Sequence, residues 1–335
     1  MTRKTAAVAL ALLLALASAG CSRSRDALTV YSGRTQNLVG PLLERFNQET
    51  GIAIDVKYGD SAELALLLAE EGDRSPADVF FSQSPGATGF LAGKGRLAQL
   101  DTGLLGKVDQ RFHNRDGRWV GVSGRQRVLV YNTELVAERD LPDSVLELTG
   151  DRFTGKLALA PSNGSFQDFV TAMRQLEGED ATTRWLKAMA GNKPRTYANN
   201  NAIVEAVSRG EVPMGLVNHY YNYRFQQERP DTPSRNHGFA DGDVGALVIP
   251  STASVLAGSD KADKAARLVE FLLSPEAQRY FSDQTFEYPL VQGIPAAPGL
   301  PPLASLHSPD YDVDALGGGL ERTVELIRSS GFNGV

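Results

Sequence analysis

The sequence predicts an α/β fold made of two lobes with a ligand cleft between them. The chain has 335 residues, which corresponds to about two domains of roughly 150 residues each. β-rich runs alternate with helical patterns through the first hundred residues, and the same alternation returns after residue 128. This alternation is typical of a parallel sheet with helices on both faces.

The pattern in the first half of the chain predicts three strand–helix units. Apolar residues recur at helical spacing from Leu38 onward, and Gly51 ends that helix. Asp60 or Ser61 caps the next helix, and Gly72 closes it. The expected strands are 27–32, 52–56 and 77–81, and the expected helices are 38–50, 61–71 and 86–92.

The second half repeats this organisation with longer connections. The polar stretch 228–243 is expected to be a surface loop, and the proline-rich stretch 295–302 is expected to be an extended connector. Pro275 suits the first position of a helix. The expected strands are 128–131, 156–160, 212–217 and 245–250, and the expected helices are 144–148, 166–176, 181–190, 202–208, 261–273, one from 274, and 319–329.

The composition excludes several functional classes. The formal net charge is −6, so the chain has no basic excess with which to bind nucleic acid. A single cysteine excludes a disulfide framework and a thiolate zinc site. The four histidines are scattered and form no metal-binding cluster in the sequence. No nucleophile-elbow, zinc-protease, P-loop or dinucleotide motif is present, so we do not expect an enzyme.

The N-terminus predicts export from the cytoplasm. Arg3 and Lys4 precede an apolar run, 6–17, which at twelve residues is too short to span a bilayer core that needs about 20. Cys21 follows small residues and is the expected lipidation site, after a signal peptide at 1–20 and before a tether at 21–26. The alternative is ordinary cleavage after Ala19. We therefore expect an extracytoplasmic protein that meets the membrane only through a lipid.

Two exported α/β lobes favour a solute-binding protein that closes on its ligand. Open α/β sheets bind ligands beyond the carboxyl ends of their strands, and two such lobes place that site in the cleft. A secreted two-domain enzyme is the alternative.

The most unusual cluster is 217–223, which contains Tyr220 and Tyr221 and directly follows an expected strand. Phenols are neutral at pH 7, but a bound trivalent cation favours the phenolate. Hard oxygen donors suit a hard cation such as ferric iron. From these residues alone, packing or a platform for an organic ligand remains the competing interpretation.

Several segments resemble a known family. The chain from Leu28 onward is similar to the ferric-ion-binding proteins of ABC iron importers, which are transferrin-like members of the type 2 periplasmic-binding-protein fold. The segments that carry the resemblance are 28–33, 46–52, 70–80, 123–128, 210–213 and 218–221. The resemblance implies two lobes joined by two crossover strands, near 120–127 and 244–250.

The resemblance also implies a ligand set. Tyr220 and Tyr221 match the two iron-ligating tyrosines of the family. A synergistic anion, phosphate or carbonate, would bind at a helix start, where backbone N–H groups are free. The residues that match the anion site are Asn163, Gly164, Ser165, Asn200 and Asn218.

On the first-lobe side the chain departs from the family. Thr35 and Gln83 stand where some members have histidine and glutamate, and Phe166 stands where others have a third tyrosine. Water, Thr35 and Gln83 could complete the iron shell, or Tyr31 could contribute. Arg125 and Arg127 are further candidate contacts, which could balance the anion or form plain salt bridges.

The resemblance implies an iron transport protein that binds Fe(III) and delivers it to the permease of an ABC transporter, and we expect a monomer. The expected lobes are 27–125 with 250–300, and 126–249 with 301–335. Because Thr35 and Gln83 lack charge, the first alternative is the same fold binding a phosphonate, an organophosphate or a polyamine. A secreted hydrolase is the second alternative.

Overall fold

The computed structural model describes residues 26–332. The predicted signal peptide and Cys21, with nearly all of the predicted tether, lie outside the described residues. Within residues 26–332, no helix has the length and apolar character needed to cross a membrane.

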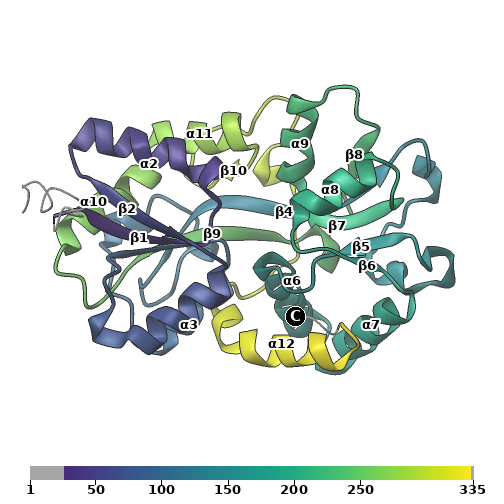
Figure 1. Ribbon diagram of the computed structural model, residues 1–335, viewed down its shortest axis with the longest axis horizontal. Helices are drawn as coiled ribbons and strands as arrows, with labels where there is room; N and C mark the ends of the chain where they lie inside the picture. Colours follow the sequence, from purple (N-terminus) through teal and green to yellow (C-terminus); the bar gives the residue numbers. More distant parts are fainter. Residues whose placement is uncertain (1–25, 333–335) are drawn as a thin grey trace, which may run out of the picture.

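One mixed sheet runs through the molecule, and it confirms the predicted two-lobed α/β architecture (Figure 1). Its main path has the order β2-β1-β3-β9-β4-β7-β5-β6, and β8 and β10 both pair with β4. The strands are β1 Leu28–Ser32, β2 Ile54–Tyr58, β3 Val79–Ser82, β4 Val120–Asn132, β5 Leu157–Leu159, β6 Arg195–Thr196, β7 Met214–Asn218, β8 Ser234–His237, β9 Val248–Val255 and β10 Tyr288–Pro289.

We call the β1–β3 side with its helices the first lobe, and the β5–β8 side with its helices the second lobe. β1 pairs in parallel with β2 and β3, and β5 pairs in parallel with β6 and β7. The first-lobe helices are α2 Gln36–Thr50, α3 Ser61–Glu71, α4 Pro85–Gly93, α5 Thr102–Leu105, α10 Ala262–Leu272 and α11 Pro275–Thr285. The second-lobe helices are α6 Gly164–Leu176, α7 Glu179–Gly191, α8 Asn200–Ser208, α9 His219–Glu228 and α12 Leu320–Ser329.

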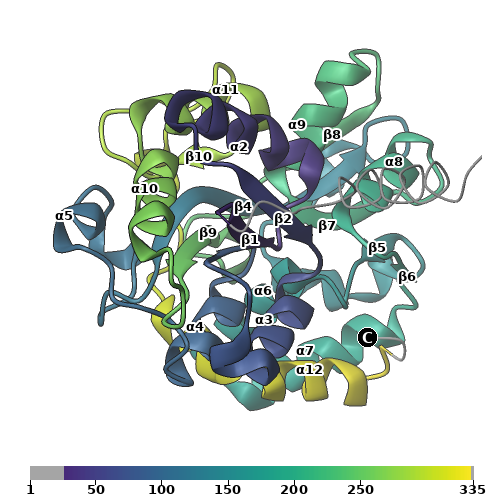
Figure 2. The same cartoon turned by 60° about the vertical axis from the view of Figure 1, so that its left-hand side comes forward.

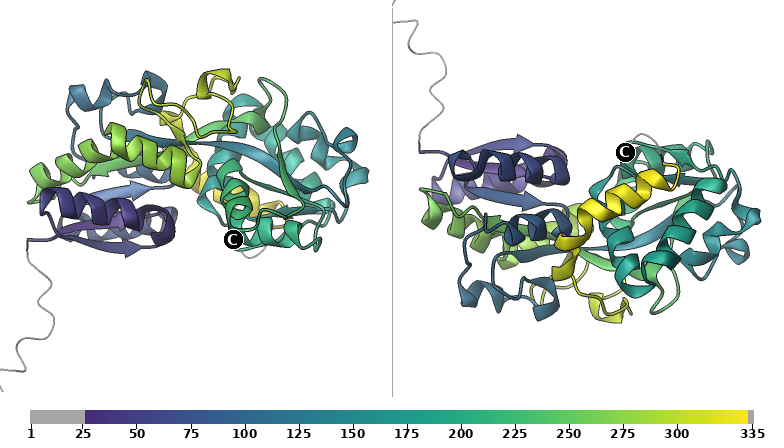
Figure 3. Two further views of the ribbon diagram at one scale, coloured as in Figure 1. Left: turned by 90° about the horizontal axis from the view of Figure 1, so that it is seen from above. Right: turned by 90° about the horizontal axis from the view of Figure 1, so that it is seen from below.

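Helices cover both faces of the first-lobe sheet. In Figure 2, α2, α10 and α11 lie above the strands, and α3 and α4 lie below them. Figure 3 shows from two further sides that α12 begins near the junction of the lobes and runs over the second lobe. Local hydrogen bonding and backbone conformation set the start of α3 and the end of α2. The Asp60 side chain accepts the Ala62 N–H at the start of α3, and Gly51 ends α2 in the left-handed conformation.

The two lobes are joined by long antiparallel strands. β4 pairs with β9 through Gln126 and with β7 from Arg127 onward, so one strand passes from the first lobe to the second. The β-rich run expected at 128–131 covers only the last part of β4, and the crossover strand that the resemblance implies near 120–127 is its first part. This first part carries polar residues such as Ser123 and Arg125, which are buried here against neighbours that the sequence pattern does not reveal.

Two local predictions, a surface loop and the type of one helix, are wrong. The predicted surface loop at 228–243 contains β8, which has no apolar residue and is held by backbone pairing with β4. The helix expected at 144–148 is a 3-10 helix, Val145–Thr149. The tyrosine cluster directly follows a strand, as expected, and it forms the start of α9.

Candidate functional site

The tyrosine pair lies where β7 ends and α9 begins. Tyr220 and Tyr221 occupy the first turn of α9, directly after Asn218 at the carboxyl end of β7. Their rings are stacked, with centroids 4.2 Å apart and an interplanar angle of 28°. Tyr220 is fully buried, and its hydroxyl has no hydrogen-bond partner among the described residues. Buried hydroxyls normally have a partner, so this oxygen is available to a ligand.

Burial disfavours ionisation of the Tyr220 hydroxyl in the absence of a cation. Burial raises the pKa of the Tyr220 hydroxyl well above its ordinary value, and Tyr221 adds to the effect, while Arg34 opposes it. Ionisation without a counter-charge is therefore unfavourable at neutral pH. A multivalent cation between the two oxygens would reverse this balance by stabilising the phenolates.

A polar pocket lies at the start of α6, beside the end of β7. Asn163 caps α6, and its Oδ1 accepts hydrogen bonds from the Ser165 N–H at 3.2 Å and from Ser165 Oγ at 2.6 Å. Asn200, the first residue of α8, donates from Nδ2 to the same oxygen at 3.2 Å. Asn200 Oδ1 and Asn218 Nδ2 are buried and have no partner in the part of the chain that the structure describes. The structure thus brings the predicted anion residues together around a helix N-terminus.

Arg127 makes this pocket cationic. It lies opposite Asn218 in the β4–β7 register, and its Nη1 lies 3.4 Å from Asn218 Oδ1 and 3.5 Å from Ser165 Oγ. Its Nε has no partner among the described residues. Burial lowers the pKa of Arg127 to about 9, and Arg125 adds to the effect. Arg127 therefore lies with the second-lobe pocket, and its placement among the first-lobe contacts was wrong.

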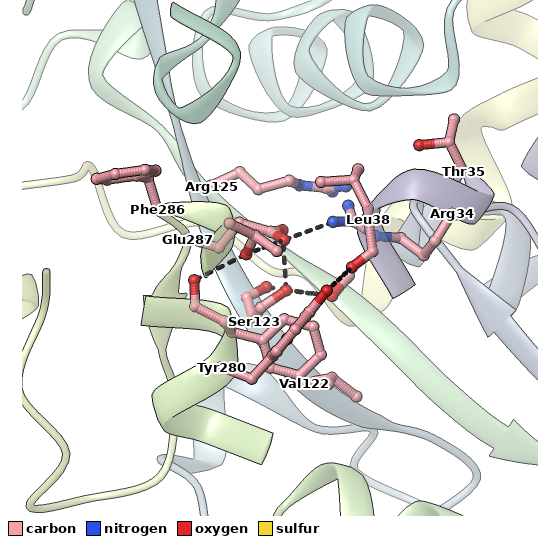
Figure 4. Close-up of polar contacts among 12 residues, drawn as sticks. Arg34, Thr35, Leu38, Val122, Ser123, Arg125, Tyr280, Phe286 and Glu287 are labelled. Carbon is pink, nitrogen blue, oxygen red and sulfur yellow. Dashed lines mark hydrogen bonds and ion pairs between the residues drawn. The ribbon is translucent and has the colours of Figure 1, made fainter. Parts of the chain in front are cut away.

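A second group of charges, Arg34, Arg125 and Glu287, comes from the first lobe and the crossing strands, and Figure 4 shows these side chains close together. Arg34 follows β1, and its guanidinium carbon lies 5.7 Å from the centroid of the Tyr220 ring. Its Nη2 pairs with Glu287 Oε2 at 2.5 Å, and both side chains are fully buried. Glu287 also accepts hydrogen bonds from Ser123 at 2.9 Å and Thr285 at 3.0 Å.

The two guanidiniums of this group are incompletely satisfied. Nε and Nη1 of Arg34 and Nη1 of Arg125 have no partners among the described residues. Burial would lower the pKa of Arg34, but Glu287 and the tyrosines outweigh it and raise the pKa. Burial lowers the pKa of Arg125, and neighbouring Arg34 lowers it further. Arg34 and Glu287 are not among the residues expected from the sequence, where the only local signal is a cation directly after the first strand.

The remaining first-lobe candidates differ in their placement. Thr35 is exposed and bonds Asn37 at 2.6 Å, and Figure 4 shows its side chain apart from the Arg34–Glu287 pair. Gln83 is buried, and its Nε2 has no partner among the described residues. Tyr31 directs its hydroxyl to Glu71 at 3.0 Å, and Lys57 Nζ lies 4.9 Å from its ring centroid. Gln83 is thus the candidate with a free buried donor.

His219 fixes the start of α9 to the crossing strand. Its Nδ1 accepts the Gln126 N–H at 3.1 Å, so Nε2 carries the proton that is donated to the Phe286 carbonyl at 2.7 Å. Burial lowers the pKa of His219 to about 4. Both ring nitrogens are used, so His219 positions its neighbour Tyr220 and is not free to bind a metal. Residues 26–332 contain no group of three or more His, Cys, Asp or Glu side chains placed to hold a metal ion.

Comparison with known proteins gives consistent results. The family model described as bacterial extracellular solute-binding protein matches residues 74–313. The chain is 32% identical over 331 residues to the Fe(3+)-binding periplasmic protein of Serratia marcescens, covering 98% of this chain and 96% of that protein. It is 33% identical over 327 residues to the major ferric iron-binding protein of Neisseria meningitidis serogroup B, covering 96% and 97%. The crystal structure of iron-bound HitA from Pseudomonas aeruginosa has a TM-score of 0.87 at 35% identity, covering 91% of this chain and 99% of that chain.

Proposed function

The chain belongs to the family of bacterial extracellular solute-binding proteins, and we propose that it is the ferric-iron-binding component of an ABC importer. The observation that carries the proposal is the stacked, buried pair Tyr220 and Tyr221 beside a cationic pocket at the start of α6. Iron binds to the two phenolate oxygens, and an oxyanion in the pocket completes its shell. Hard oxygen donors of this kind match a hard trivalent cation.

Charge balance supports an anion that binds together with the metal. A trivalent cation with two phenolates and a divalent anion keeps a single negative charge. Arg34, Arg125 and Arg127 are buried around the site, and Glu287 is ion-paired with Arg34. An excess of buried positive charge is costly, and a negatively charged metal–anion assembly offsets it. Phosphate and carbonate both satisfy this requirement.

The donor set of the anion is Asn163, Gly164, Ser165, Asn200 and Asn218, with Arg127 as its cation. Each member supplies a backbone N–H, an amide, a hydroxyl or a guanidinium, and two of these donors, Asn218 Nδ2 and Arg127 Nε, are buried without a partner among residues 26–332. On the first-lobe side, Gln83, Arg34 and Arg125 face the cargo. Thr35 and Tyr31 are not part of this proposal, because their side chains bond Asn37 and Glu71.

Closure of the two lobes accompanies binding. The change of β4 partners between Gln126 and Arg127 supports a boundary there, with lobes comprising 27–125 with 250–300 and 126–249 with 301–335. The packing of α12 against α6 and α7 supports assignment of α12 to the second lobe, whereas the preceding segment 314–319 packs against α4 of the first lobe. Only the closed form contacts the cargo from both sides, so the cargo selects it. The protein works outside the cytoplasm as a monomer, anchored by a lipid on Cys21, and delivers iron to a permease.

Ferric citrate titration with visible spectroscopy and metal analysis tests the proposal. Wild-type protein is expected to develop a tyrosinate charge-transfer band and to retain about one iron per chain after desalting. Tyr221→Phe is expected to abolish the band. Asp180→Asn, an exposed change on α7, is the control and should leave the band unchanged. A wild-type protein with neither band nor bound iron overturns the proposal.

A second candidate, an organic phosphate or phosphonate, is favoured by one observation. The first lobe supplies the cation Arg34 and the amide Gln83, and both have donors without a partner among the described residues. Position 35 carries threonine, which is neither an imidazole nor a carboxylate. Such donors suit phosphoryl oxygens. Thermal unfolding with ferric citrate, phosphate and phosphonates in parallel separates the candidates, because the true ligand stabilises the folded protein most.

A further inference from the structure

A buried carboxylate links the two lobes away from the tyrosine pair. Asp168 lies on α6 of the second lobe and is 1% exposed. Its Oδ1 accepts hydrogen bonds from Ser84 Oγ at 2.6 Å and from the Gly86 N–H at 3.3 Å. Both donors belong to the start of α4 in the first lobe. Neither the metal ligands nor the anion pocket requires this contact.

The start of α4 is suited to receive a carboxylate. Ser84 caps α4 by accepting the Ala87 N–H at 3.1 Å, so its hydroxyl proton is free for Asp168. The positive end of the helix dipole and the Gly86 N–H, which donates to Asp168, partly offset the cost of burying this carboxyl. A Cβ on Gly86 would lie 2.6 Å from Asp168 Oδ1. Glycine at this position is therefore what allows the carboxylate to approach.

The contact lies at the seam between the lobes. A Cβ built on Gly164, in the proposed anion turn, would lie 3.7 Å from the Cβ of Ser84. The starts of α4 and α6 therefore face each other, and Asp168 is one helical turn beyond the anion turn. Any movement that draws the start of α4 away from α6 separates Asp168 from Ser84 and Gly86.

We propose that Asp168 is a positioning residue for lobe closure, and that its contact with Ser84 and Gly86 holds the first lobe over the anion pocket. The contact stabilises the closed arrangement by hydrogen bonds that the open arrangement exchanges for water. Its loss shifts the population toward open molecules without removing any group that touches the cargo.

Protonation of Asp168 gives this contact a measurable signature. Burial raises the pKa of Asp168 to about 7; the Ser84 hydroxyl and Arg125 of β4 oppose burial, and Asp60 at the start of α3 reinforces it. Tyr311, which precedes the last helical segments, also faces the carboxyl. In open molecules the carboxyl meets water, where its pKa is about 4. Closure therefore takes up a proton between about pH 4 and about pH 7, and it weakens as the pH rises through 7.

Small-angle X-ray scattering of the cargo-free protein from about pH 5 to about pH 9 tests the proposal. Wild-type protein is expected to expand as the pH rises through 7. Asp168→Asn keeps the acceptor for Ser84 but cannot titrate, so it stays compact at every pH. Asp168→Ala and Gly86→Ala are expected to be expanded throughout. Thr171→Val removes a buried hydroxyl that bonds Thr323 within the second lobe, and it should follow wild type.

Release of iron provides a second readout, which rests on the proposed function. Asp168→Ala is expected to release iron about five- to thirtyfold faster, the effect of losing one or two buried hydrogen bonds. If iron fails to bind but the scattering behaves as described, the iron assignment is wrong and the closure contact stands. If Asp168→Ala scatters like Thr171→Val, or Asp168→Asn keeps the wild-type pH profile, the closure proposal is overturned. The pH dependence of the scattering of Asp168→Asn tests the closure proposal even if Asp168→Ala does not fold.

Discussion

Arg127 and Asn218 lie opposite each other on β4 and β7, with Arg127 Nη1 3.4 Å from Asn218 Oδ1. Both side chains are buried, and each keeps a donor without a partner, Nε of Arg127 and Nδ2 of Asn218. An unsatisfied buried donor costs ~1–3 kcal/mol, so an oxyanion that bonds both donors recovers that free energy. An anion bound at this pair therefore gains the most binding free energy.

Arg127→Met is expected to weaken phosphate binding at least tenfold, because it removes the only guanidinium that contacts Ser165 and Asn218 in the described residues. Isothermal titration calorimetry of the iron-free protein measures this change. Arg184→Met, on the exposed face of α7, is the matched control and should bind as wild type. Equal affinities for both variants would remove Arg127 from the anion site.

Phosphate binding should also depend on alkaline pH through Arg127. Burial lowers the pKa of Arg127 to about 9, so the anion-free protein loses this charge as the pH rises through 9. The bound anion requires the charged form and raises that pKa, so affinity falls by about tenfold per pH unit above 9. Calorimetry from about pH 8 to about pH 10 measures the slope. Arg127→Met should lack the break near pH 9; a break that persists there must come from another group.

Tyr220→Phe is expected to separate stability from binding. The Tyr220 hydroxyl is buried without a partner, so its removal should raise the free energy of unfolding of the iron-free protein by up to about 1 kcal/mol. The same change removes one phenolate ligand and should abolish tight iron binding. Urea unfolding and the iron titration measure the two effects. A marked destabilisation of Tyr220→Phe would mean that the Tyr220 hydroxyl has a hydrogen-bond partner in solution and is not available to a ligand.

The Arg34–Glu287 pair should be strongly coupled. Glu287→Gln removes the negative charge that pairs with the buried Arg34, and it should destabilise the protein by about 3–5 kcal/mol. Adding Arg34→Met to that variant should restore much of the loss, because the uncompensated charge is then gone. A double-mutant cycle from denaturant unfolding gives the coupling free energy. Additive losses would contradict a direct pair.

The local elements were largely predictable, because their signals lie within a few residues. Helical spacing and glycine at position 51 predicted α2, and Asp60 with Gly72 predicted the bounds of α3. β8 was missed because its residues are polar and its pairing partner, β4, is distant in the sequence. The strand pattern indicates only the last part of β4 for the same reason: its polar first part is buried only by tertiary neighbours.

For the site, the sequence indicated the groups on the second lobe more fully than those that face them. Tyr220 and Tyr221 stand out as neighbours after a strand, and the turn at Asn163 begins a helix. Glu287 pairs with a residue 253 positions away, and Asp168 bonds Ser84 across 84 positions. No local pattern reports such pairs.

The sequence by itself determined most of the strands and helices, the paired phenols and the family resemblance, because apolar periodicity, caps and short motifs are encoded between near neighbours. Only the tertiary structure decided which charges are buried around the phenols, that Thr35 bonds Asn37 while Arg34 faces Tyr220, and that Asp168 spans the seam. Those outcomes depend on how two lobes pack, and burial and charge pairing exist only once distant segments meet.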